Sequence, residues 1–227
     1  MTTETEQASF GPELFGFLAD LKDHNDRDWF NANKDRYEAD VLEPSLAFIE
    51  DFAPLLHQIS PHFRADPRRV GGSLFRIYRD TRFSKDKTPY KTTAGIWFKH
   101  EQAKDVHAPG FYLHLAPGDV FAAGGIWHPD TPTVTKIREA IVADPDGWRE
   151  AIAGVDLGMG ETLKRVPPGY EKDHPLAEDI KRKDFGAIER MTEKDATAPH
   201  FLQRYASACE SMTPVMRFLC RAVGVPF

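Results

Sequence analysis

The sequence predicts an α+β fold, in which N-terminal and C-terminal helices pack on a central, mainly antiparallel sheet. Helical periodicity is found towards both ends of the chain, whereas short segments of strand character follow one another between residues 71 and 126. Only a few turn residues separate most of these segments, too few for the crossover that a parallel pair of strands needs. Closely spaced strands between blocks of helix are typical of α+β domains rather than of alternating α/β ones.

The N-terminal part predicts three helices. The first has four apolar residues with the i, i+3, i+4, i+7 spacing of an amphipathic helix: Leu14, Phe17, Leu18 and Leu21. A second helix is predicted over residues 26–42, with Asn25 as its N-cap and Pro44 ending it. A third follows over residues 45–59, in which Pro54 introduces a kink or an early end.

The middle of the chain predicts the sheet. Four segments have strand character: Leu74–Tyr78, Ile96–Phe98, Phe111–Leu115 and Val120–Ala122. Alternation within the third of these places Tyr112 and His114 on one face, opposite the apolar side chains that face the core. The glycine pair Gly124-Gly125 predicts a bulge or a close approach of backbones.

The C-terminal part predicts helices again, and no linker divides the chain. The expected helices are one over residues 132–143, a short one near Trp148, and one over residues 199–223 with Pro214 as an interruption. There is no internal repeat and no low-complexity tract. We therefore expect a disordered lead over residues 1–9 and a single domain over residues 10–227.

Composition predicts a protein of the cytoplasm. The 227 residues are 41 % hydrophobic with a net charge of −6, which is ordinary for a globular domain. No apolar run is long enough to span a membrane, and the polar N-terminus has no signal-peptide pattern. The two cysteines, Cys209 and Cys220, are too few for a disulfide framework.

Positive charge is concentrated in one stretch. Residues 64–91 hold nine basic side chains against three acidic ones, a net +6, so the rest of the chain carries −12. The strand predicted over Leu74–Tyr78 is expected to end near Arg79. Residues 80–89 are expected to form a loop that returns at Tyr90. Loops held at both ends by a sheet are places where binding residues occur.

The residue types in this stretch favour recognition of an anion. Arginine binds carboxylates and phosphates through two parallel hydrogen bonds, and lysine supplies a mobile charge. The candidate ligand-binding residues are Arg76, Tyr78, Arg79, Arg82, Tyr90 and Lys91. If the protein is an enzyme, Asp80 or Asp86 is the candidate general base, and Lys87 or an arginine is the candidate transition-state stabiliser.

The same stretch resembles the signature of a widespread bacterial family of conserved hypothetical proteins, domain of unknown function 2461. The matching residues are Arg76, Arg79, Asp80, Arg82, Phe83, Asp86, Lys87 and Tyr90. The segment from Phe17 through Asn25 and Trp29 to Tyr37 is similar to the family's N-terminal block. The resemblance covers nearly the whole chain and implies a bacterial protein, but it brings no established activity.

Two further groups are secondary pocket candidates. Trp29 and Asn33 lie four residues apart on one face of the second predicted helix, where core packing is the favoured interpretation. His114 lies in a predicted strand and could act as an acid or base, although a solvated strand histidine is the more common case. No spacing of histidines and acids predicts a metal site, and no nucleotide-binding glycine motif is present.

We therefore expect a protein that binds an anionic small molecule, phosphorylated or carboxylated, through a basic loop at residues 76–91. The less favoured alternative is a nucleic-acid-binding module in which the same stretch faces phosphates. A third alternative is structural: the aspartates pair with the arginines and pin a long loop that binds nothing. Neither a cofactor nor a membrane partner is expected.

Overall fold

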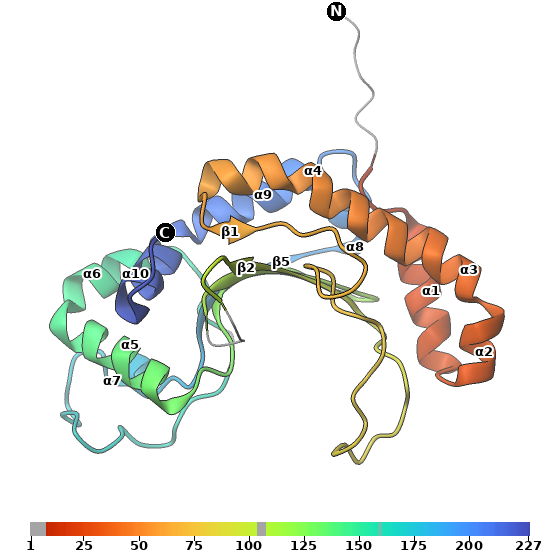
Figure 1. Cartoon of the computed structure of the whole chain (residues 1–227). Helices are drawn as coiled ribbons and strands as arrows, with labels where there is room; N and C mark the ends of the chain where they lie inside the picture. The colour runs from red at the N-terminus through yellow and green to blue at the C-terminus, as the bar shows by residue number, and fades with distance from the viewer. Residues whose placement is uncertain (1–7, 104–107, 159) are drawn as a thin grey trace, which may run out of the picture.

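The computed structural model describes residues 8–103, 108–158 and 160–227. It confirms an α+β fold with one antiparallel sheet and helices from both ends of the chain packed on it (Figure 1). Most of the lead predicted over residues 1–9 lies outside the described residues. Within the described part, no helix is both long and apolar enough to cross a membrane.

The sheet has five strands whose spatial order equals their chain order, and every neighbouring pair is antiparallel. The strands are β1 (Phe63–Arg64), β2 (Ala94–His100), β3 (Gly110–Ala116), β4 (Asp119–Ile126) and β5 (Phe185–Met191). β3 and β4 are joined by a tight turn in which Gly118 has a φ of +75°, a conformation that glycine adopts without steric cost. Three of the predicted strands are therefore confirmed as β2, β3 and β4.

The strand predicted over Leu74–Tyr78 was wrong. This segment makes only isolated bridges, from Leu74 to Ile96 and from Tyr78 to Tyr90. Alternation is a local signal, and after one contact with the edge of β2 the chain turns away from the sheet. Residues 78–90 then form a closed hairpin-like loop, held by backbone hydrogen bonds from Arg79 to Pro89 and from Lys91 to Ile77. The predicted return of the loop at Tyr90 is confirmed.

The first and third predicted N-terminal helices are confirmed, whereas the second is divided into shorter pieces. The N-terminal helices are α1 (Pro12–Asp23), α2 (Arg27–Ala32), α3 (Lys34–Tyr37), a π-helical turn η1 (Glu38–Leu42) and α4 (Glu43–Ile59). Pro44 does not end a helix, because it lies in the first turn of α4, directly after the wide π turn, where its missing N–H is tolerated. Pro54 lies inside α4 without ending it. Asp26 is the N-cap of α2, whereas Asn25 has another role described below.

The helices predicted over residues 132–143, near Trp148 and over residues 199–223 are confirmed, whereas two short helices between them were not predicted. The later helices are α5 (Thr131–Ala143), α6 (Pro145–Ala151), α7 (Ala177–Ile180), α8 (Glu193–Ala196), α9 (Phe201–Ser211) and α10 (Thr213–Val223). The break between α9 and α10 comes just before Pro214, as predicted, and it places the buried Cys209 and Cys220 on different helices.

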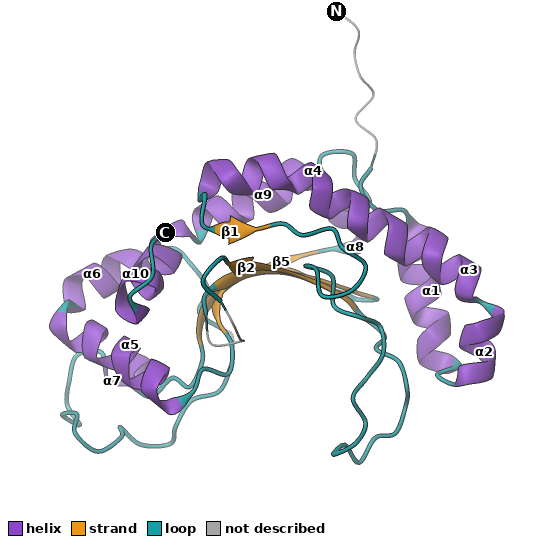
Figure 2. Cartoon of the chain, viewed as in Figure 1, coloured by secondary structure: helices purple, strands orange, loops and turns teal. Residues whose placement is uncertain are grey.

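Helices α4, α9 and α10 cover the convex face of the sheet (Figure 2). Alternate residues of the strands, such as Phe98, Phe111 and Leu113, are fully buried beneath them. A Cβ atom on Gly124 would lie 3.3 Å from the sulfur atoms of Met212 and Met216. The predicted close approach of backbones is found at Gly125, where a Cβ atom would lie 2.2 Å from the backbone oxygen of Phe185. No described helix covers the concave face of the sheet (Figure 1).

Candidate functional site

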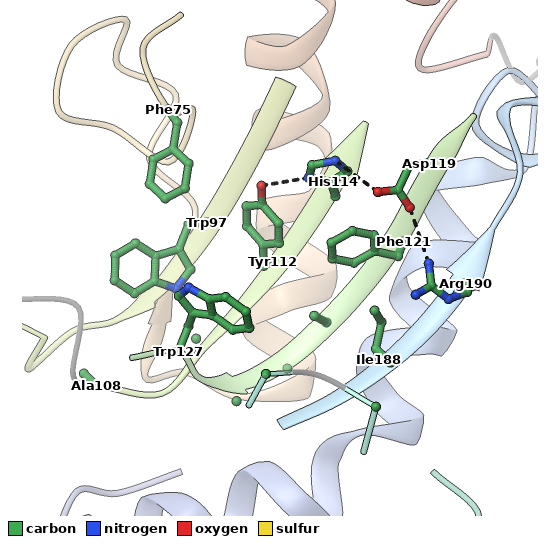
Figure 3. Close-up of a pocket in the computed structure, with 16 residues that line it drawn as sticks. Phe75, Trp97, Ala108, Tyr112, His114, Asp119, Phe121, Trp127, Ile188 and Arg190 are labelled. Atoms are coloured by element: carbon green, nitrogen blue, oxygen red, sulfur yellow. Dashed lines mark hydrogen bonds and ion pairs between the residues drawn. The ribbon is translucent and has the colours of Figure 1, made fainter. Parts of the chain in front are cut away.

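The concave face of the sheet holds a hollow of about 520 Å³, which we call the concave pocket. Its walls are mostly aromatic, with rings from β2, β3, β4 and the segments beside them: Phe75, Trp97, Tyr112, Phe121 and Trp127 (Figure 3). Small-molecule sites in proteins have volumes of this size and are similarly rich in aromatic and apolar side chains.

Glycines in the strands make room for these rings. A Cβ atom on Gly110 would lie 2.1 Å from Nε1 of Trp97, and one on Gly95 would lie 2.5 Å from the hydroxyl of Tyr112. Any larger residue at either position would push an aromatic ring off the sheet. The wide, apolar floor of the concave pocket therefore depends on glycine at these two positions.

A row of polar side chains crosses the same face from β3 to β5 (Figure 3). The hydroxyl of Tyr112 lies 3.1 Å from Nδ1 of His114, and Nε2 of His114 lies 3.7 Å from a carboxylate oxygen of Asp119. The other oxygen of Asp119 accepts a hydrogen bond from Arg190 at 3.4 Å. We call these four residues the polar row.

Burial sets the protonation of the polar row. It lowers the pKa of His114, although Asp119 acts in the opposite direction. It also raises the pKa of Tyr112 to about 12. At neutral pH the imidazole is therefore uncharged and the phenol keeps its proton. The tautomer that fits this geometry has its proton on Nε2, towards Asp119, and accepts the hydroxyl proton of Tyr112 at Nδ1.

Beside the pocket, the buried carboxylate of Asp184 fixes two loops. It accepts hydrogen bonds from the backbone N–H of His128 at 2.7 Å and of Glu161 at 3.1 Å. Gly160, which lines the pocket, packs so closely on Asp184 that a Cβ atom would lie 2.3 Å from it. These contacts hold the residues that directly follow Trp127 and Gly160 in the chain. They therefore fix one wall of the pocket.

The basic loop has a different character, because two of its arginines are paired with acids of the loop itself. Arg79 binds Asp86 and Thr88, and Arg82 binds Asp80 at 2.7 Å. The ammonium group of Lys87 donates to the backbone oxygen of Thr81 at 2.8 Å. The arrangement contains the arginine–aspartate contacts that the structural alternative requires.

These contacts also bear on the candidate bases of the loop. The hydrogen bond from Arg79 lowers the pKa of Asp86 to about 2, and that from Arg82 lowers the pKa of Asp80. Carboxylates held in this way are weak bases at neutral pH. The catalytic roles assigned to Asp80, Asp86 and Lys87 stay predictions, and the electrostatics do not favour them.

A second, more polar hollow of about 320 Å³ lies between α2 and the basic loop. It brings together three of the predicted residues, Tyr78, Arg79 and Tyr90, with two that sequence reasoning missed, Arg27 and Asn31. Asn25 closes this junction: its side-chain amide exchanges two hydrogen bonds with the backbone of Tyr90, at 3.0 and 3.1 Å, as a neighbouring strand would.

One predicted cation, Lys91, lies beside a wall of the concave pocket. Its ammonium group lies 5.1 Å from the ring centre of Phe75. Burial lowers the pKa of Lys91, and the neighbouring charge of Arg76 lowers it further. Within the described part of the chain, Lys91 makes no ion pair with an acid, so its charge is available beside Phe75. Arg76 lines neither hollow, and its charge acts on both Lys91 and Asp80.

The secondary pocket candidates lie in different parts of the structure. His114 lines the concave pocket, whereas Trp29 and Asn33 line neither hollow. Trp29 stacks on His24 and packs against Phe17, and the amide of Asn33 donates to the backbone of Trp29 where α2 ends. Among the described residues, no group of three histidine, cysteine or acidic side chains is arranged to hold a metal ion.

Sequence reasoning did not single out Asp119, Phe121, Trp127 or Arg190 as site residues. Asp119 directly precedes the predicted strand Val120–Ala122, and the tight β3–β4 hairpin places it beside His114. The available signal in the sequence was the short turn Pro117-Gly118, because a turn of two residues pairs Ala116 with Asp119. Arg190 lies on β5, a strand that was not predicted.

Comparison with known proteins agrees with the resemblance found in the sequence. A family described as conserved hypothetical protein (DUF2461) matches residues 13–218. The chain belongs to this family. The match includes every residue of the concave pocket and of the basic loop. Among curated proteins, none matches the sequence.

Proposed function

We propose that this protein binds a small organic anion whose planar, apolar part lies in the concave pocket. The observation that carries the proposal is the set of five aromatic side chains around one hollow, with the ammonium group of Lys91 beside Phe75. Aromatic walls favour a planar ring, because rings stack face to edge or offset and bury large apolar areas. The nearby charge of Lys91 favours a carboxylate, sulfonate or phosphate on that ring.

This proposal keeps the anionic ligand expected from the sequence and changes its place. Of the six predicted ligand-binding residues, Arg79 and Arg82 are engaged by acids of their own loop. Lys91 is not, and its ammonium group lies 5.1 Å from the ring centre of Phe75, which lines the larger and more apolar hollow. The nucleic-acid alternative stays a prediction.

Binding is tested with anilinonaphthalene sulfonate, a planar aromatic anion whose fluorescence rises in apolar sites. The Trp97→Ala variant removes one wall of the pocket and is expected to weaken binding about tenfold, the equivalent of about 1.4 kcal/mol. Trp29→Ala is the matched control, because Trp29 is also partly buried and packs far from the pocket. It is expected to bind the probe as the unaltered protein does.

The charge requirement is tested with Lys91→Gln. This variant is expected to weaken binding of the sulfonate about two- to fivefold and to leave binding of the uncharged parent compound, anilinonaphthalene, unchanged. Melting curves of each variant show whether the fold is intact. If Trp97→Ala binds normally while Arg79→Ala does not, the ligand lies at the basic loop and the proposal is wrong.

A further inference from the structure

We infer that Tyr112 and His114 form an acid–base pair that enolises a carbonyl compound bound in the concave pocket. The inference rests on the proposed function, because the pocket must first hold a planar organic anion. The substrate class is an aromatic 2-oxo acid or a related anion that has an acidic C–H next to a carbonyl group. The geometry of the polar row supports each role in turn.

The two groups have the spacing that enolisation needs. The hydroxyl of Tyr112 and Nδ1 of His114 are 3.1 Å apart and both belong to the concave face of β3. In a carbonyl compound, the oxygen and the adjacent C–H are also close neighbours, so one ligand reaches both groups at once. A base within hydrogen-bond reach of the proton, with a donor at the oxygen where charge develops, is the arrangement that lowers such a barrier.

Their protonation states match these roles. His114 is uncharged at neutral pH and accepts a proton at Nδ1 when the hydroxyl of Tyr112 turns to the ligand. The hydroxyl of Tyr112 keeps its proton and donates it to the carbonyl oxygen. Asp119 is a positioning residue: it lies 3.7 Å from Nε2 of His114, orients the ring and stabilises its charged form. Arg190 holds Asp119 from the other side.

The reaction balances without any further reactant. His114 Nδ1 takes the proton from carbon, the C–H electron pair forms the C=C bond, and the carbonyl oxygen takes the proton of Tyr112. The enol leaves behind an imidazolium next to a phenolate. Because these two groups are hydrogen-bond partners in the resting protein, the proton passes from Nδ1 back to the phenolate oxygen and the pair is restored.

The test follows deuterium incorporation into phenylpyruvate in heavy water, observed as loss of its methylene signal in proton NMR. We expect the protein to accelerate exchange above the background rate. The His114→Gln variant is expected to lose about a hundredfold or more of this acceleration, and Tyr112→Phe a smaller part. His57→Gln is the matched control, since His57 is exposed on α4, on the other side of the sheet.

The role of Asp119 is read from the pH profile. The groups that face His114 are Tyr112 on its own strand and Asp119 on β4, with Arg190 of β5 behind Asp119; Gly95 of β2 adds no charge. Exchange is expected to rise with pH as His114 loses its proton. Asp119→Asn removes a charge that raises the histidine pKa, so the acidic limb of the profile moves to lower pH. If Asp119 had a purely structural role, Asp119→Asn would leave the acidic limb of the profile at the same pH.

Displacement of anilinonaphthalene sulfonate by phenylpyruvate, measured on the same protein, separates the two proposals. Displacement with no exchange above background overturns the acid–base inference and leaves the binding proposal standing. Exchange that survives in His114→Gln also overturns the inference. If the protein does not accelerate deuterium exchange of phenylpyruvate and also does not bind the fluorescent probe, both proposals are wrong.

Discussion

The basic loop and the concave pocket show two ways in which charged residues are used in one protein. In the loop, Arg79 and Arg82 bind acids of the same short segment, and the aspartates involved are largely exposed. In the pocket, His114 and Asp119 lie on an apolar floor beside aromatic rings, where burial changes the pKa of the imidazole. Exposed pairs are screened by water and contribute little, whereas the desolvated Tyr112 and His114 respond to a ligand. Asp119 and Arg190, at the other end of the polar row, are exposed.

The difference teaches that density of charge in a sequence is a poor guide to where charge acts. The loop holds six of the nine basic residues of the segment from 64 to 91, yet its two acids are already paired with Arg79 and Arg82. Tyr112, His114, Asp119 and Arg190 are spread over almost eighty positions and form one connected row only because the strands are adjacent.

The largest effect is expected from a substitution that adds a single carbon atom to the pocket. In Gly110→Ala the new Cβ would lie 2.1 Å from Nε1 of Trp97, so the indole must move. We expect binding of anilinonaphthalene sulfonate to weaken about tenfold and the protein to lose about 1–3 kcal/mol of stability. Chemical unfolding and probe titration measure the two effects.

Gly16→Ala is the matched control for that change. Gly16 is exposed in α1, and a Cβ atom there would meet nothing within 4 Å. Because alanine favours helix more than glycine does, this variant is expected to gain about 0.5–1 kcal/mol and to bind normally. Normal binding by Gly110→Ala would contradict the assignment of Trp97 to the ligand's wall.

A moderate effect is expected from pH. The pKa of His114 is lower in the folded protein than its usual 6.5, so below about pH 6.5 the unfolded chain binds more protons than the folded one. Stability contributed by the neutral imidazole is therefore present above this pH and is lost as pH falls. The buried His100 acts in the same direction.

Melting temperatures between about pH 5 and 7.5 check this. His114→Gln is expected to flatten the dependence partly, because His100 still contributes, while His57→Gln keeps the full slope. An unchanged slope in His114→Gln would mean that burial does not hold this imidazole neutral.

The smallest effect on global stability is expected from the basic loop. Arg79→Ala removes the contacts to Asp86 and Thr88 but leaves the backbone bonds that close residues 78–90. We expect the melting temperature to change by less than about 3 °C. Amide hydrogen exchange in residues 80–88 is expected to become about tenfold faster, because the loop opens locally. Unfolding of the whole protein would instead support the structural alternative for the loop.

Sequence reasoning succeeded where the local pattern and the tertiary environment agree. The alternation of β3 placed Tyr112 and His114 together on the face opposite Phe111, Leu113 and Leu115, as the structure has them. It succeeded because a strand with one face under helices and the other lined by polar-tipped aromatics keeps a strict period of two.

Sequence reasoning failed where a contact with a residue distant in the sequence determines the local structure. β5 carries Glu189 and Arg190 side by side, and each is explained only by a distant partner, Arg204 of α9 and Asp119 of β4. The segment Leu74–Tyr78 alternates well but finds only one bridge on β2. Asn25 has the residue type of an N-cap, yet its amide pairs with Tyr90, sixty-five positions away. None of these partners is visible in a local window.

The order of the strands has a kinetic consequence. β2, β3 and β4 are consecutive along the chain, so their pairing needs only short loops to close, and such contacts form early in folding. β5 joins the sheet only after residues 127–184 have been spanned, a loop whose closure costs more entropy. Asp184 directly precedes β5 and Arg190 lies in it, so both reach their places only when this strand pairs. The hydrogen bonds from Arg190 to Asp119 and from the backbone of His128 to Asp184 are therefore expected to form last. A spectroscopic probe at Trp127 would report this final step of folding.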